Sequence, residues 1–257
     1  MALIELDRVT KRFGGLVANR EVSFRLEEPC LVGLIGPNGA GKTTLFNCIA
    51  GFFPPTEGRI IFRGQDITHR RDYEVARLGL ARTFQIFQAS GDLKVVENVM
   101  VGAFLQTSSR RAARAKALEA LEFLGIGDSA PALMTELPVA AQKRVALATA
   151  LASDPVLILL DEVGAGLNRS EIEGLVGLLR KIHQERGVSL LLTEHVLEMV
   201  MALSHRVLVL ESGQLIADGR PEEVVQNPEV IRAYLGDHFV KRTGDGAAPA
   251  GEGAQDA

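Results

Sequence analysis

Apolar and polar residues alternate along several short segments near the start of the chain. Segments 3–9 (LIELDRV) and 22–26 (VSFRL) have the two-residue period of half-buried strands, and 57–67 (EGRIIFRGQDI) predicts another strand with a glycine turn. Segment 30–35 (CLVGLI) is apolar throughout, which is typical of a buried parallel strand. A glycine-rich turn follows it, and then a helix is expected through 43–51.

The second half of the chain predicts strands that alternate with helices. Apolar strands are expected at 156–162 (VLILLDE) and 188–193 (VSLLLT), and a strand pair at 206–219. Helices are expected at 169–186 and 195–203. Because parallel strands need crossover connections, this alternation predicts an α/β protein with a mostly parallel sheet.

Composition changes between about residues 107 and 124, where alanine, arginine, leucine and glutamate dominate. Leu118, Leu121 and Leu124 recur at helical spacing, so the segment predicts a helical insert. The insert carries a run of basic residues, Arg110, Arg111, Arg114 and Lys116. A solvated helix face explains this run better than a binding patch does. From about Lys241 onward, glycine, alanine and proline predict a disordered tail.

Composition and charge narrow the class of protein. The 257 residues are 47% apolar and 23% charged, an ordinary globular balance, with a net charge of −4 and a pI of about 5.8. A nucleic-acid-binding protein usually has a basic surplus, so no nucleic-acid partner is expected. Cys30 and Cys48 lack metal-type spacing and predict reduced thiols in the cytosol. No apolar run approaches the ~20 residues that span a bilayer, so any membrane role is expected to go through a partner.

A complete phosphate-binding pattern lies between the strand at 30–35 and the helix that follows it. The segment 36–43 (GPNGAGKT) fits G-x-x-x-x-G-K-[ST] at every fixed position. Consecutive backbone N–H groups in such a loop bind phosphate oxygens, and glycines allow the close approach. We expect Lys42 to contact the β- and γ-phosphates and Thr43 to ligate Mg²⁺.

Two carboxylates follow the apolar strand at 156–162. Asp161 is expected in the magnesium shell. Glu162 is expected to point elsewhere, because side chains alternate along a strand, and to act as the general base that polarises water. A strand ending in Asp-Glu is a weak signal alone, and the phosphate loop strengthens it.

In these motifs the chain resembles the ATP-binding subunits of ABC transporters, and most of all the ATPase subunits of branched-chain amino acid importers. The segments that carry the resemblance are RFGGLVA (12–18), GPNGAGKTTLFNCIAGF (36–52), ARTFQ (81–85), LDEVGAGLN (160–168) and the stretch at 193–224. It implies a RecA-like P-loop NTPase core with a mostly parallel sheet, an N-terminal antiparallel β subdomain and an inserted helical subdomain. The ATP-binding domain is expected at 3–240, with the helical insert at about 86–150 and the tail at 241–257.

The resemblance also implies roles for individual residues. Phe13 matches the aromatic that stacks on adenine, although a small core phenylalanine would look the same. Gln85 matches the glutamine that senses magnesium and contacts the permease, and His195 matches the switch histidine at the γ-phosphate. Gly166, Leu167 and Asn168 match the loop beside the dimer seam. The implied nucleotide-binding residues are Phe13, Gly36, Pro37, Asn38, Gly39, Ala40, Gly41, Lys42, Thr43 and Thr44. The implied magnesium ligands are Thr43, Gln85 and Asp161, and the implied catalytic residues are Glu162, His195 and Gln85.

One motif departs from the family pattern. The family has L-S-G-G-Q where this chain has Leu137, Pro138, Val139, Ala140 and Ala141. The helix should still form, because proline is favoured in a first turn. The contact with the γ-phosphate bound by the other subunit should weaken, because proline offers neither an N–H nor a hydroxyl. Val163, where the family usually has proline, should matter little.

Two interpretations of this departure remain. In the favoured one, the chain pairs with a different ATPase subunit that carries an intact motif. In the other, it is a diverged homodimer with two weak sites. The expected assembly adds transmembrane permease subunits and, indirectly, a periplasmic binding protein, and it lies at the cytoplasmic face of the inner membrane. The expected ligands are ATP and Mg²⁺. The alternatives are a nucleotide-binding regulatory module without hydrolysis and an ABC ATPase outside transport.

Overall fold

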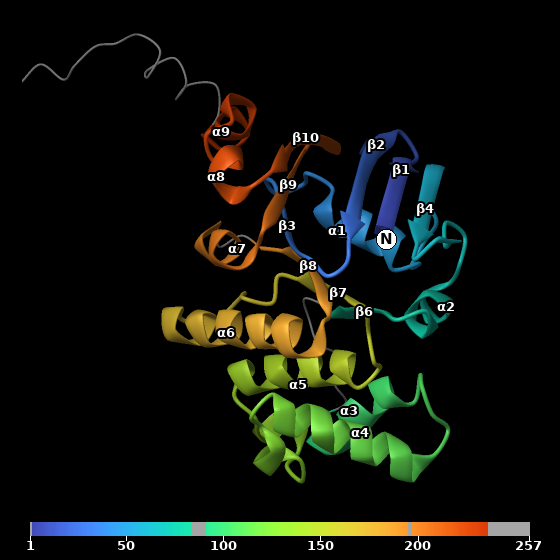
Figure 1. Cartoon of the computed structure of the whole chain (residues 1–257), viewed down its shortest axis with the longest axis vertical. Helices are drawn as coiled ribbons and strands as arrows, with labels where there is room; N and C mark the ends of the chain where they lie inside the picture. The colour runs from blue at the N-terminus through green and yellow to red at the C-terminus, as the bar shows by residue number, and fades with distance from the viewer. Residues whose placement is uncertain (1, 84–90, 195–196, 236–257) are drawn as a thin grey trace, which may run out of the picture.

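Two β-sheets organise the chain (Figure 1), for which the computed structural model describes residues 2–83, 91–194 and 197–235. The larger sheet has the strand order β10-β9-β3-β8-β7-β6, and all its strands are parallel except β10, which is antiparallel to β9. Its strands are β3 (Leu31–Ile35), β6 (Leu80–Thr83), β7 (Leu157–Asp161), β8 (Ser189–Thr193), β9 (Arg206–Glu211) and β10 (Gln214–Gly219). The predicted α/β class with a mostly parallel sheet is confirmed.

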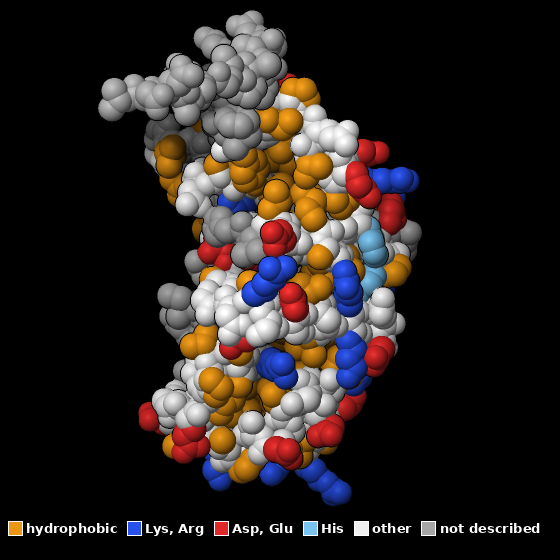
Figure 2. Space-filling model, turned by 90° about the vertical axis from the view of Figure 1, so that its left-hand side faces the viewer, with side chains coloured by type: hydrophobic (Ala, Val, Ile, Leu, Met, Phe, Trp, Pro, Cys, Tyr) orange, Lys and Arg blue, Asp and Glu red, His pale blue; other side chains and the backbone are white. Residues whose placement is uncertain are grey.

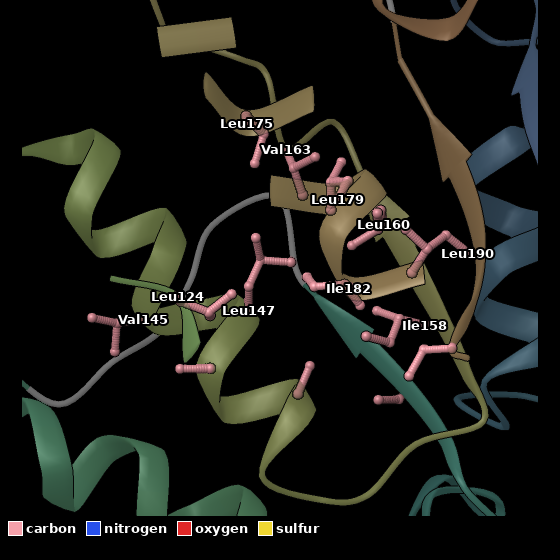
Figure 3. Packing of buried hydrophobic residues seen from close by; sticks show 14 of the residues in the cluster. Leu124, Val145, Leu147, Ile158, Leu160, Val163, Leu175, Leu179, Ile182 and Leu190 are labelled. Atoms are coloured by element: carbon pink, nitrogen blue, oxygen red, sulfur yellow. The ribbon is translucent and has the colours of Figure 1, made fainter. Parts of the chain in front are cut away.

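The parallel strands are mostly apolar because other elements cover both faces of their sheet. Leu157 and Leu159 of β7 belong to a core shared with α1 (Lys42–Ile49) and the smaller sheet. Ile158 and Leu160 point to the opposite face, where they belong to a second core that includes α5 and α6. A close view of this second core shows β7 and β8 side chains meeting those of α5 and α6 (Figure 3).

Register brings the carboxyl ends of three strands to one edge of the larger sheet. Leu34 of β3 lies opposite Thr193 of β8, and Asp161 of β7 lies opposite Thr193 from the other side. The segments that follow these strands are the phosphate loop, the segment after Thr193 and the segment after Asp161. In open parallel sheets, ligands bind outside the carboxyl ends of the strands.

The smaller sheet is antiparallel, with the order β2-β1-β4-β5. Its strands are β1 (Ala2–Phe13), β2 (Leu16–Glu27), β4 (Glu57–Phe62) and β5 (Gln65–Asp66). Strands β1 and β2 extend well beyond the predicted 3–9 and 22–26. Several register shifts interrupt their pairing, and much of the added length is exposed, so the alternation that identifies a strand fades although the ladder continues.

Helices cover the larger sheet and form a separate group below it in Figure 1, where α3, α4 and α5 pack together. The longer helices are α3 (Val95–Ala103), α4 (Arg110–Phe123), α5 (Val139–Leu151), α6 (Arg169–Arg186) and α9 (Pro228–Leu235). The shorter ones are α2 (Asp72–Arg77), α7 (Leu197–Leu203) and α8 (Pro221–Val224), with 3₁₀ turns at Gly127–Ser129 and Met134–Glu136. The boundary of the helical insert stays a prediction, and the tail at 241–257 lies outside the described residues.

The hydrophobic pattern does not identify two of the helices, and their packing explains why. Helix α3 (VVENVMVGA) is rich in β-branched residues and buried on most sides, so its sequence resembles a strand. Helix α5 has four consecutive buried residues, 145–148, because it lies between other elements, and such a helix loses its amphipathic period.

In α4 the buried face is made mainly of alanines, while Leu118 is 37% exposed. Leu121 is fully buried, so the spacing of the leucines identifies the helix but only part of its packed side.

The surface mixes charges of both signs. On the face shown in Figure 2, lysine and arginine are interspersed with aspartate and glutamate, with apolar side chains between them. Among the described residues, no helix combines the length and hydrophobicity needed to cross a membrane.

Candidate nucleotide site

The phosphate loop turns sharply between β3 and α1, and its glycines make this path possible. Gly36 has φ 153° and Gly41 has φ 98°. A Cβ at Gly36 would lie 2.1 Å from the carbonyl oxygen of Leu210, and one at Gly41 would lie 2.3 Å from that of Ala18. The loop is therefore closed from behind by β9 and β2, and no larger residue fits at either position without moving backbone.

Hydrogen bonds fix the same loop to its surroundings. The Ala40 N–H donates to the carbonyl of Pro37 at 3.2 Å, and the Gly213 N–H donates to the carbonyl of Ala40 at 3.1 Å. The buried Asn19 side chain donates to the carbonyl of Gly41 at 3.2 Å. The structure thus holds the whole predicted segment in place, with Asn38 and Gly39 at its exposed tip and Thr43 and Thr44 in the first turn of α1.

Lys42 lies under the loop. Its ammonium donates to the carbonyls of Gly36 at 2.7 Å and Pro37 at 3.0 Å. Burial lowers the pKa of Lys42, while the nearby charges of Glu162 and Asp161 act to raise it. This loop lysine and the two predicted carboxylates, more than a hundred residues apart in the sequence, therefore share one electrostatic environment.

Asp161 is almost fully buried and held at both carboxylate oxygens. The Thr193 hydroxyl donates to Oδ1 at 2.8 Å, and the Arg82 guanidinium donates to Oδ2 at 2.8 Å. The same guanidinium donates to the Asn47 side chain on α1. Asn47 lies one turn after Thr43 in α1. Arg82 therefore connects Asp161 to the helix that follows the phosphate loop.

These residues suit a magnesium ion. Thr43 and Asp161 supply oxygen atoms, the ligand type that Mg²⁺ prefers. An ionised carboxylate has about four acceptor positions, so Asp161 keeps some beyond its two observed bonds. Gln85 lies outside the described residues, two positions after β6 ends.

Glu162 leaves the strand rather than continuing its alternation. Its φ is 50°, a left-handed conformation that is uncommon outside glycine, and its N–H donates to the carbonyl of Thr193 at 2.9 Å. Strand β7 ends at Asp161, so the turn at Glu162 gives this side chain a direction different from that of Asp161. Such a conformation costs of order 1–3 kcal/mol and is often found at functional sites.

Core packing and a hydrogen bond hold the segment after Glu162 in place. Val163 is buried and lies with Leu175 and Leu179 in the core (Figure 3), so an apolar side chain takes the place of the family's proline. The Gly164 N–H donates to the buried carboxylate of Glu194 at 2.7 Å. His195, the next residue, lies outside the described residues.

Phe13 lies at the end of β1 with a ring that is 46% exposed. Its edge meets Phe53, with ring centroids 5.5 Å apart, and the Lys11 ammonium lies 5.2 Å from its centroid. The small core phenylalanine considered as an alternative is therefore excluded, and the ring is accessible for stacking.

The unusual segment 137–142 forms a regular helix start. Pro138 is the N-cap residue of α5, and the Gln142 side chain donates to the carbonyl of Leu137 at 2.9 Å. Val139 is 54% exposed. The expectation that the helix forms despite the substitutions is confirmed.

Several residues near the site have no motif that selects them, among them Asn19, Arg82, Thr193, Glu194 and Tyr234. Burial raises the pKa of the Tyr234 hydroxyl, and a hydrogen bond with the backbone of Gly36 acts against that rise. Helix α9 therefore reaches the first glycine of the phosphate loop. Arg82 and Thr193 lie within segments that carry the family resemblance, and that proximity is the only sequence signal for them.

An apolar groove of about 340 Å³ lies between the elements around β6 and the group of helices formed by α3, α4 and α5. Its walls come from the end of α1, from α2 and β6 on one side, and from α3 and α5 on the other. Phe52, Tyr73, Val101 and Leu105 line it together with Arg82. Phe52 and Tyr73 are each 47% exposed, so aromatic surface is available there for a partner.

Comparisons with known proteins agree with this geometry. Residues 19–165 match the family model described as ABC transporter, and residues 214–240 match the model described as branched-chain amino acid ATP-binding cassette transporter. The chain is 38% identical to the high-affinity branched-chain amino acid transport ATP-binding proteins LivG of Salmonella typhimurium, over 250 residues, and BraF of Pseudomonas aeruginosa, over 251. Each alignment covers 91% of this chain and 98% of the relative.

Solved structures give the same result. A nucleotide-free ATP-binding cassette from an ABC transporter superposes with a TM-score of 0.83 at 30% identity, covering 92% of this chain and all of the other. The ADP conformation of the ATP-binding cassette MJ1267 gives the same TM-score, identity and coverage.

Proposed function

The chain belongs to the ATP-binding cassettes of the ABC transporter family, which are ATPases, and on this basis we propose that it energises the uptake of branched-chain amino acids or a related small polar solute. The observation that carries the ATPase part of the proposal is the shared environment of Lys42, Asp161 and Glu162 at the carboxyl ends of β3 and β7. A phosphate loop with two carboxylates beside its lysine suits the binding and cleavage of a nucleoside triphosphate. The proposed solute follows from the likeness to the branched-chain amino acid transport ATP-binding proteins LivG and BraF.

The nucleotide is proposed to bind along the loop from Gly36 to Thr44. Backbone N–H groups there would surround the phosphates, and Lys42 would exchange its bonds to loop carbonyls for bonds to phosphate oxygens. An exposed face of Phe13 would stack on adenine, while Phe53 packs against the ring in a T-shaped arrangement and the Lys11 ammonium lies over the ring.

Magnesium would be held by Thr43, Asp161 and Gln85. When bound, it neutralises charge on the phosphates. The chain's own part is to hold the Asp161 carboxylate in one orientation through Thr193 and Arg82.

Glu162 is the proposed general base, with His195 helping to position the attacking water. The left-handed turn separates the Glu162 side chain from the Asp161 carboxylate, so one acidic residue can serve the metal and the other the water. Positioned general bases contribute roughly 10²–10⁴ in rate.

The substitution Glu162→Gln tests this assignment. ATP binding should persist, because glutamine keeps the shape, while turnover in the presence of a partner cassette should fall by roughly 10²-fold or more. Equilibrium binding of ATP and phosphate release are the two measurements. Glu173→Gln, on the exposed side of α6, is the matched control and should hydrolyse ATP normally. Unaltered hydrolysis by the Glu162 variant would contradict the proposal.

The degenerate segment 137–142 supports an asymmetric pair of cassettes. We propose that this chain supplies a complete phosphate loop and both carboxylates, and that a different cassette supplies the intact helix start that completes the site. The reciprocal site would face Pro138 and Val139, which provide no hydroxyl for a phosphate. Comparing ATP hydrolysis by the chain alone and with a second cassette tests this arrangement.

The apolar groove is the proposed contact with the permease. Its aromatic rim suits an amphipathic segment of a membrane subunit, which would hold the cassette at the cytoplasmic face of the inner membrane. A periplasmic binding protein would deliver the solute to that permease without touching this chain.

A further inference from the structure

Arg82 touches both the carboxylate at the end of β7 and the wall of the apolar groove. Its guanidinium bonds to Asp161 at 2.8 Å on one side, and its side chain lines the groove on the other. The guanidinium carbon lies 5.5 Å from the centre of the Phe52 ring, which is itself part of the groove wall. One side chain therefore spans the distance between the two proposed sites.

The ion pair is buried to an extent that stability alone does not require. The Arg82 and Asp161 side chains are 7% and 3% exposed. Two charges lose much of their hydration there, and apolar residues of similar size often serve stability as well or better. The pair is better explained by the fixed orientation that it gives to the Asp161 carboxylate.

Arg82 fixes that carboxylate together with Thr193. One donor bonds to each carboxylate oxygen, so the plane of the group cannot turn without breaking a bond. The second arm of the guanidinium bonds to Asn47 on α1, which holds the arginine itself. Lysine cannot reproduce this fork, because its ammonium is a single point of charge.

We propose that Arg82 is a positioning residue that orients Asp161 for the metal and connects it directly to the groove wall at Phe52. A segment bound in the groove would press on Phe52 and the arginine stem, and the carboxylate would move with them. This inference rests on the proposed function, because it assumes that Asp161 contributes to a magnesium–nucleotide site.

The experiment measures the Mg²⁺ requirement of nucleotide binding. The full chain and its Arg82→Lys variant are titrated with a fluorescent ATP analogue in EDTA and over a range of Mg²⁺ concentrations. We expect the variant to bind the analogue in EDTA within twofold of the unsubstituted chain. The half-saturating Mg²⁺ concentration should rise about tenfold, the size expected when one hydrogen bond to a charged group is lost. A purely structural role would lower thermal stability without shifting this requirement.

Arg59→Lys is the matched control. Arg59 forms an Arg–Asp pair with Asp7 at 3.0 Å on the exposed smaller sheet, so the same substitution there should leave the Mg²⁺ requirement unchanged. An Arg82→Lys protein that folds and keeps the original requirement would overturn the proposal.

Phe52→Ala tests the connection to the groove and remains available if Arg82→Lys does not fold, since the Phe52 ring is exposed. Its Mg²⁺ requirement should shift in the same direction, by two- to threefold, and no shift would overturn the connection. An unsubstituted chain that fails to bind the analogue with Mg²⁺ would instead contradict the proposed function.

Discussion

Cys48 lies on the buried face of α1, behind the phosphate loop, and is 2% exposed. Burial raises the pKa of its thiol to about 12, and the charge of Lys11 only partly opposes that rise. Burial also raises the pKa of Cys30. Because thiolates, not thiols, react with electrophiles, both cysteines are protected by the fold rather than by a disulfide.

We expect iodoacetamide at pH 8.5 to label Cys48 in the folded protein at least roughly 100-fold more slowly than an exposed cysteine of ordinary pKa, because burial both raises the pKa and limits access. In the unfolded chain both cysteines should react readily, which mass spectrometry would show. Above pH 9 the unfolded chain loses this proton while the folded protein keeps it until about pH 12, so the contribution of Cys48 to stability falls as pH rises through that range. Rapid labelling of Cys48 in the native state would contradict this assignment.

At the scale of elements, α4 shows how small side chains set a packed face. Ala113 and Ala117 are fully buried against neighbouring helices, while Leu118 is partly exposed. Alanines allow α3, α4 and α5 to approach closely, so there is little space for a larger residue on that face.

Overpacking tests this face. Ala117→Leu should lower the free energy of unfolding by about 1–3 kcal/mol, because three added carbon atoms must displace neighbours. Leu118→Ala, at the adjacent position, should change it by less than about 1 kcal/mol. Urea unfolding followed by circular dichroism measures both. Equal effects of the two substitutions would mean that α4 packs through its leucine face instead.

At the scale of the whole molecule, the proposed nucleotide site and the helix start proposed to face a neighbouring cassette differ in how closely they follow the family pattern. The phosphate loop, Asp161 and Glu162 are grouped within one chain, whereas Pro138 and Val139 occupy the helix start that would face a second chain. This contrast is the reason to expect a dissimilar partner.

Restoring the family motif tests the asymmetry. The chain alone should hydrolyse ATP very slowly, and mixing it with a cassette that has an intact motif should activate it. The combined substitutions Pro138→Ser, Val139→Gly, Ala140→Gly and Ala141→Gln should raise the rate of the chain alone roughly ten- to a hundredfold, the value of one bond to a charged group. Adding Glu162→Gln to this variant should abolish the gain. Rapid ATP hydrolysis by the unaltered chain alone would refute the asymmetry. The absence of hydrolysis in every mixture would favour a regulatory module.

Much of the architecture is predictable because its signals are local. Strands β3, β7 and β8 are short apolar runs, and α6 lies between Asn168, which caps it, and Gly187, which ends it in a left-handed conformation. The phosphate loop is predictable for the same reason, since a run of consecutive residues supplies its binding groups. Helix α3 is not, because burial on several sides removes the period that would identify it. Helix α5 has also lost its hydrophobic period, and only the family resemblance of its first turn led us to expect it.

By itself, then, the sequence determined the elements whose chemistry lies in neighbouring residues: the loop from Gly36 to Thr43, and Asp161 at the end of β7 with Glu162 directly after it. Only the tertiary structure decided what surrounds them. Arg82 meets Asp161 across 79 positions of sequence, and Thr193 meets it across 32. Such contacts depend on strand order and register in a parallel sheet, and no local pattern of residues encodes which distant side chains will share a buried site.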